Sequence, residues 1–154
     1  FNAPGQVAIA GHREAVDRAI QAASAAGAKR AIRLPLSVPV HCELMKPAAQ
    51  RFARTLADTV VKSPTLQVLH NVDVMARSEP ADIRDALVTQ VHSPVRWADT
   101  VRQFATLGVD TLIELGPGKV LSGLAKRIDR SITALAVTDA ASLSKALTHT
   151  GGDS

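Results

Sequence analysis

Short apolar runs alternate in this sequence with longer segments whose apolar residues recur at helical spacing, and this alternation restricts the fold most strongly. The strand-like runs are rich in Val, Leu, Ile and Ala and cover residues 6–10, 28–36, 66–72, 111–115 and 132–137. The helical segments cover residues 12–26, 43–61, 82–90, 95–107, 119–128 and 142–148. Because strands covered by helices on both faces are apolar throughout, the pattern predicts an α/β fold with a parallel sheet.

Glycine and proline mark where these elements end. Gly27 stands where the first helix needs a C-cap. Pro47 is tolerated only in a first helical turn, so the second helix is expected to begin near Glu43. The composition changes across residues 35–39, where a domain boundary is predicted. There is no internal repeat or low-complexity block.

Composition excludes several classes of function. Aromatic residues make up 3% of the 154 residues, with no tyrosine, which argues against a stacking platform for single-stranded nucleic acid. The net charge of +4 is spread along the chain and indicates either mild attraction for an acidic or phosphorylated partner or an ordinary solvated surface. Apolar runs stay below the about 18–20 residues of a membrane span, so no membrane role is expected.

Cysteine and histidine are placed singly. One cysteine excludes a disulfide within the chain, and five scattered histidines predict no metal site. The sequence begins at Phe1, inside a motif that looks structured, without a signal or transit pattern. We therefore expect these residues to be the C-terminal portion of a longer protein.

His41 is the first candidate for chemistry. It follows the run RLPLSVPV directly and precedes a predicted helix, so its ring can project into a cleft at the sheet edge. A histidine there can act as a general base, or its ring can simply hydrogen-bond the loop. Cys42 is adjacent but is expected to be a small buried residue, because neighbouring side chains at a helix start diverge. A G-x-S-x-G nucleophile motif is absent from the sequence.

Two further features leave alternatives open. The turn of Gly116, Pro117, Gly118 and Lys119 before a predicted helix is either a structural turn or a place for a phosphate at a helix N-terminus. Pro94 stops the helix after Gln90, which can leave the Gln90 carbonyl to accept a proton from a histidine Nδ1. The spacing of residues does not by itself support this role for the Gln90 carbonyl.

Five stretches together resemble the malonyl-CoA:acyl carrier protein transacylase family, in the family's order and spacing. They are FNAPGQVAIAGH at 1–12, AGAKRAIRLPLSVPVHCELMKPAA at 26–49, HNVDV at 70–74, IRDALVTQVHSPVRW at 83–97 and ELGPGKVLSGLAKRI at 114–128. The resemblance implies an α/β-hydrolase-like domain with an inserted ferredoxin-like subdomain, both incomplete in this chain. Residues 1–36 would be the second half of the small subdomain, and residues 37–154 the C-terminal half of the large domain.

The resemblance also implies roles for single residues. His41 matches the histidine that takes the proton of a nucleophilic serine and returns a proton to the leaving thiol. Gln90 matches the residue whose main-chain carbonyl orients that histidine, and Asn2 matches an asparagine lining the substrate cleft. The serine elbow, an oxyanion-hole glutamine loop and a malonyl-binding arginine belong upstream of Phe1. Val40 departs from the serine usual before the histidine, which puts a local hydrogen bond from that position in doubt.

The implied reaction is malonyl transfer from malonyl-CoA to acyl carrier protein through a malonyl-serine, in fatty-acid synthesis, by a cytoplasmic monomer without cofactor. The carrier protein is acidic, so four basic residues are candidates for docking it, with solvated surface as the alternative. They are Lys29, Arg30, Lys126 and Arg127. Competing hypotheses are an acyltransferase domain of a polyketide synthase and a non-catalytic module that holds the carrier protein. This chain alone is expected to be inactive.

Overall fold

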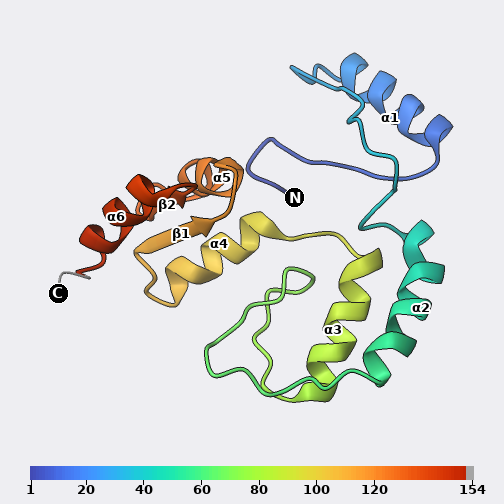
Figure 1. The fold of residues 1–154 in the computed structure, drawn as a ribbon. Helices are drawn as coiled ribbons and strands as arrows, with labels where there is room; N and C mark the ends of the chain where they lie inside the picture. Colours follow the sequence, from blue (N-terminus) through green and yellow to red (C-terminus); the bar gives the residue numbers. More distant parts are fainter. Residues whose placement is uncertain (152–154) are drawn as a thin grey trace. The chain divides into compact units, whose positions relative to one another are not determined.

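A computed structural model describes residues 1–151 and divides into two compact units. Of the described residues, the first unit contains 1–7 and 96–151, and the second contains 8–95. Figure 1 shows the helices and strands of each, and each unit is described by itself below.

The first unit is built on a pair of parallel strands. β1 (Thr111–Leu115) pairs with β2 (Thr133–Val137), with Thr111 opposite Thr133 and Leu115 opposite Val137. Three helices belong to this unit: α4 (Trp97–Thr106), α5 (Val120–Ile128) and α6 (Ala140–His149) (Figure 1). Because parallel neighbours need a crossover, α5 joins β1 to β2 as a β-α-β unit.

Small side chains form the core of this unit, as the aromatic-poor composition requires. Its buried members come from α4, α5, β2 and the residue just before β2: Val101, Ala125, Ala134 and Ile132. Trp97, Leu112 and Ile128 pack against them. Residues of this size let helices approach the sheet closely, so a compact core forms with few aromatic rings.

The second unit is helical in its described residues. It contains α1 (Arg13–Ala25), the 3-10 turn η1 (Glu43–Met45), α2 (Lys46–Ala57) and α3 (Pro80–His92). α2 and α3 lie side by side (Figure 1). The guanidinium of Arg84 on α3 ties them by donating to the carbonyls of Leu56 and Thr59 at 3.1 and 3.0 Å, which supplies partners for carbonyls at the end of α2.

The predicted helices and the last two strands are confirmed. β1 has the predicted bounds, and β2 begins one residue later than expected. Pro47 lies in the first turn of α2, as its sequence position requires. Gly27 follows the C-cap of α1 with φ of 85°, a left-handed conformation that glycine adopts without a steric penalty.

Three predicted strands are wrong for this chain. Residues 6–10, 28–36 and 66–72 join no sheet in the described part, apart from isolated bridges between Ala3 and Gln6 and between Leu69 and Ala76. Their apolar side chains, such as Val7 and Ile9, are exposed. A strand needs a neighbouring backbone to receive its hydrogen bonds, and the described residues supply none there.

The α/β class and the parallel pairing are therefore confirmed. The finer hydrolase-like and ferredoxin-like architecture, and the predicted domains of residues 1–36 and 37–154, remain predictions. No helix in the described part of the chain has both the length and the apolar character needed to cross a bilayer.

Candidate active site

The backbone of His41 is held in an unusual conformation. Its φ is 60°, a region that non-glycine residues occupy rarely and at a cost of about 1–3 kcal/mol. Two hydrogen bonds to α3 hold the residue in place. The His41 N–H donates to the carbonyl of Val91 at 3.2 Å, and the ring Nδ1 lies 2.9 Å from the carbonyl oxygen of Gln90.

The end of α3 explains why these two carbonyls accept bonds from His41. In a continuing helix the Gln90 carbonyl would accept from the N–H of residue 94, but residue 94 is proline and has none. Ser93 is extended, so the helix has already ended. Pro94 thus leaves the Gln90 carbonyl oxygen available, and His41 uses it.

This contact fixes which ring nitrogen carries the proton. A carbonyl oxygen can only accept, so the Nδ1 of His41 must be the donor. In the neutral ring, Nε2 then carries the lone pair. His41 is half-buried, so it combines a fixed tautomer with a nitrogen suited to take a proton.

Cys42 does not pair with His41. Its Sγ donates to the carbonyl of Pro39 at 3.1 Å, within the same turn. The half-buried thiol therefore has a local backbone partner, as expected for a structural cysteine.

Asn2 belongs to the other unit and lies in a tight turn. Gln6 N donates to the Ala3 carbonyl at 2.9 Å, while the Gln6 carbonyl accepts from the N–H groups of Ala3 and Asn2 at 3.2 and 3.1 Å. The preceding carbonyl, of Phe1, accepts from the Ala98 N–H at the start of α4 at 3.1 Å. The Asn2 backbone is therefore fixed on both sides.

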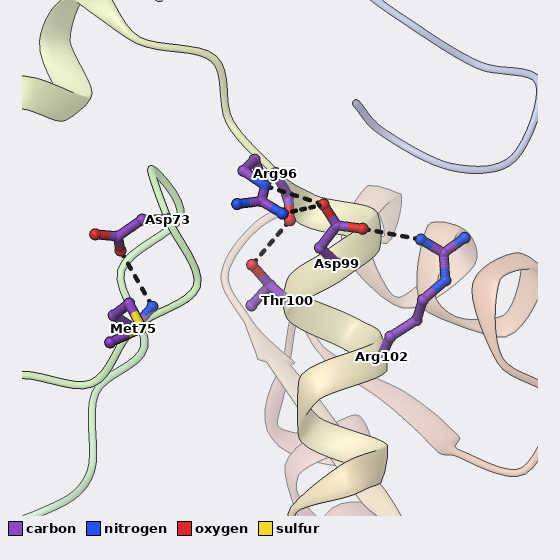
Figure 2. A network of polar contacts seen from close by, with 6 residues as sticks. All are labelled: Asp73, Met75, Arg96, Asp99, Thr100 and Arg102. Carbon is purple, nitrogen blue, oxygen red and sulfur yellow. Dashed lines mark hydrogen bonds and ion pairs between the residues drawn. The ribbon is translucent and has the colours of Figure 1, made fainter.

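A hollow of about 290 Å³ lies beside this turn. Its charged lining consists of Arg96, Asp99 and Arg102, and both arginines contact the Asp99 carboxylate at 3.0 Å (Figure 2). Phe1, Ala3, Pro4 and Ala98 complete the lining. These arginines are not recognisable as site residues from the sequence, because an i, i+3 pattern of opposite charges is ordinary on a helix surface.

The N-terminus of α5 is already occupied. The two carboxylate oxygens of Glu114 accept from the N–H groups of Leu121 and Ser122 at 3.1 and 2.8 Å. These backbone hydrogen bonds hold the pKa of the Glu114 carboxyl below its usual range, and the bond from Ser122 has the largest effect. These contacts favour a structural turn before α5, because the Glu114 carboxylate takes two of the N–H groups that a phosphate at this helix end would bind.

The sequence pattern of the family described as "Acyl transferase domain" matches residues 1–147. The chain belongs to this family. A malonyl CoA-acyl carrier protein transacylase of Salmonella typhimurium is 56% identical over 149 residues, which cover 97% of this chain and 48% of that protein. The enzyme of Escherichia coli K12, with the same name, is 53% identical over 147 residues, covering 96% and 48%.

Solved structures agree with this acyl transferase assignment. An acyl carrier protein S-malonyltransferase from Vibrio cholerae superposes with a TM-score of 0.92 and is 53% identical, covering 95% of this chain and 48% of that one. A malonyl-transacylase solved in complex with a type II PKS acyl-carrier protein gives a TM-score of 0.95 at 52% identity, covering 97% and 48%. The predicted resemblance is confirmed, and the chain spans about half the length of these relatives.

The predicted docking residues of this acyl transferase domain are all exposed. Lys29 and Arg30 follow α1 in the second unit, and Lys126 and Arg127 form the last turn of α5 in the first. The Nη1 of Arg127 donates to the side-chain Oε1 of Gln6 at 2.7 Å. Sequence reasoning missed this partner, because 121 residues separate the two positions.

Proposed function

We propose that the complete protein transfers malonyl from malonyl-CoA to the phosphopantetheine thiol of acyl carrier protein through a malonyl-serine intermediate. The observation that carries this proposal is the 2.9 Å contact between the Nδ1 of His41 and the Gln90 carbonyl oxygen. The relatives' names support the substrate and the acceptor, since both the Salmonella and the Escherichia coli proteins are malonyl CoA-acyl carrier protein transacylases.

His41 acts as general base and then as general acid in this proposal. Its Nε2 takes the serine Oγ proton as that oxygen attacks the malonyl thioester carbon. When the tetrahedral intermediate collapses, the carbon–sulfur bond breaks and the CoA sulfur receives the proton from Nε2. The second half repeats these steps, with the carrier thiol as nucleophile and the serine as leaving group. Gln90 supplies the orienting acceptor that a carboxylate supplies in a Ser-His-Asp triad.

The serine must come from sequence outside these 154 residues, which contain no G-x-S-x-G. The chain alone is therefore expected to transfer no malonyl. In the complete protein, Asn2 lines the substrate cleft between a ferredoxin-like subdomain holding residues 1–36 and an α/β-hydrolase-like domain holding residues 37–154. The protein is proposed to act as a cytoplasmic monomer in fatty-acid synthesis.

A polyketide carrier protein is a second candidate acceptor. The relative with a TM-score of 0.95 was solved with a type II PKS acyl-carrier protein. Comparing kcat/KM for a fatty-acid carrier and a polyketide carrier, both in the holo form, separates the two acceptors. The non-catalytic module is not favoured, because the relatives are named transacylases.

Substitution of His41 tests the proposal in the full-length protein. His41→Ala removes the base, and a positioned base contributes about 10²–10⁴-fold, so malonyl transfer should fall by that factor. His12→Ala is the matched control, because His12 is exposed at the start of α1 and makes no side-chain capping bond. Transfer is measured as holo carrier protein converted to its malonyl form. Equal rates for His41→Ala and wild type would contradict the assignment.

A further inference from the structure

We propose that Arg127 is a positioning residue for the substrate cleft, which holds the Asn2 turn against α5 through the side chain of Gln6. The inference rests on the proposed function, because the role of Asn2 toward malonyl-CoA belongs to that function. It assigns Arg127 a task in loading the enzyme, whereas the sequence pattern suggested only docking of the carrier protein.

Gln6 joins two sets of contacts. Its side-chain Oε1 accepts from the Nη1 of Arg127 at 2.7 Å, and its main-chain oxygen accepts from the N–H of Asn2 at 3.1 Å. The bond from the guanidinium is charge-assisted, a class that is shorter and stronger than bonds between neutral groups. Gln6 therefore connects the guanidinium of Arg127 directly to the backbone of Asn2.

The rest of the turn is held independently of Arg127. The Phe1 carbonyl bonds Ala98 N–H, and Ala3 is buried with 5% of its surface exposed. Gly5 has φ of 72°, so the chain reverses there without strain. Loss of Arg127 should therefore shift one end of the turn without unfolding it. Because a misplacement of about 1 Å at a reacting centre can cost about 100-fold, a small shift of Asn2 is enough to weaken substrate binding.

A positioning role and a docking role for Arg127 predict defects in different steps of the reaction. Malonyl loading from malonyl-CoA needs no carrier protein, so a docking residue leaves it unchanged, whereas a positioning residue slows it. Gln6 carries no charge and cannot steer an acidic partner. A loading defect shared by Gln6 and Arg127 variants is therefore the signature of the hydrogen bond between them.

The test measures malonylation of the full-length protein by malonyl-CoA alone, with KM and the maximal rate determined separately. Gln6→Met and Arg127→Met remove the acceptor and the donor while retaining side-chain bulk. Each should raise the KM for malonyl-CoA about fivefold, as expected for one lost hydrogen bond, with a smaller change in maximal rate. The double variant should equal either single one, because both remove the same bond. Arg127→Lys, which keeps a donor, should recover part of the loss.

Arg130→Met is the matched control, since Arg130 is exposed beyond the end of α5 and should load like wild type. Thermal unfolding midpoints check that the variants fold. If a Met variant fails to fold, the KM of Arg127→Lys for malonyl-CoA decides. Wild-type loading by Gln6→Met, or multiplied effects in the double variant, would overturn the inference. A defect confined to transfer onto the carrier protein would also overturn it. Wild-type protein that takes up no malonyl would instead refute the proposed function.

Discussion

His41 shows how one proline directs a side chain that lies far away in the sequence. Pro94 removes the N–H that would have closed the last turn of α3, and the Gln90 carbonyl bonds the His41 ring instead. The strained φ of His41 persists because two carbonyls at this helix end hold it. The end of α3 therefore helps to set the orientation of the His41 ring.

Pro94→Ala should reduce malonyl loading. The variant supplies an N–H at residue 94 that competes with His41 for the Gln90 carbonyl, so we expect the maximal rate to fall about tenfold, within the contribution of a positioned base. Pro80→Ala is the matched control, because Pro80 lies in the first turn of the same helix, where an N–H has no intrahelical partner. Equal loading by wild type and Pro94→Ala would show that the helix end does not set the ring.

His70 makes the stability of the fold depend on pH. It is buried, with 6% of its surface exposed, and burial lowers its pKa below 6.5, with the nearby Arg77 acting in the same direction. The unfolded chain then binds the proton more tightly than the folded one. The stabilisation is complete above pH 6.5 and is lost as the pH falls toward the folded-state pKa.

Denaturant unfolding of the full-length protein at pH 7.5, 6.5 and 5.5 measures this effect. The free energy of unfolding should fall over the lower interval, and the fall should be smaller in His70→Gln, which does not titrate. His149→Gln is the control, since His149 is exposed at the end of α6. An identical pH dependence in wild type and His70→Gln would contradict the expected shift.

The junction between β1 and α5 is built around Glu114. Its carboxylate bonds two N–H groups in the first turn of α5 and complements the positive end of the helix. Gly116 follows with φ of 144°, and its N–H donates to the Val137 carbonyl of β2 at 3.2 Å. A strand residue thus serves as a distant cap for the next helix, and the glycine lets the chain turn between them.

Glu114→Ala should destabilise the protein by about 1 kcal/mol, the usual effect of removing a side-chain cap. Because hydrogen bonding lowers the pKa of Glu114 below 4.5, this contribution is present above pH 4.5 and is lost as the pH falls toward the folded-state pKa. The difference in unfolding free energy between wild type and Glu114→Ala should therefore shrink in acid. A difference that stays constant from pH 7 to pH 3 would contradict the cap.

The proposed function requires the complete protein to bind an acidic carrier protein, which exposed cations would attract. Lys126 is exposed in the last turn of α5, while its neighbour Arg127 has a partner in Gln6. Rim charges mainly change association rates and the dependence of those rates on salt. Lys126 is therefore the clearer docking candidate of the two.

Lys126→Glu should lower kcat/KM for the carrier protein several-fold at low salt, and the difference from wild type should shrink near 0.5 M NaCl. Loading by malonyl-CoA, measured in parallel, separates docking from catalysis. The same comparison with Lys29→Glu and Arg30→Glu tests the candidates that follow α1. A salt dependence identical to wild type would remove a residue from the docking surface.

Local sequence pattern was sufficient to predict the helices and the strands β1 and β2. Family resemblance, and not spacing, gave His41 and Gln90 as partners. The hydrogen bonds of a helix join residues four apart in the same segment, so α1 to α6 follow from neighbours in the sequence. Strands at residues 6–10, 28–36 and 66–72 did not follow, because a strand forms only when another backbone accepts its hydrogen bonds. Sequence pattern also could not predict the contacts of Arg127 with Gln6 and of Glu114 with α5. The first joins residues that are distant in the sequence, and the second forms only after the chain turns between β1 and α5, so each depends on the tertiary structure.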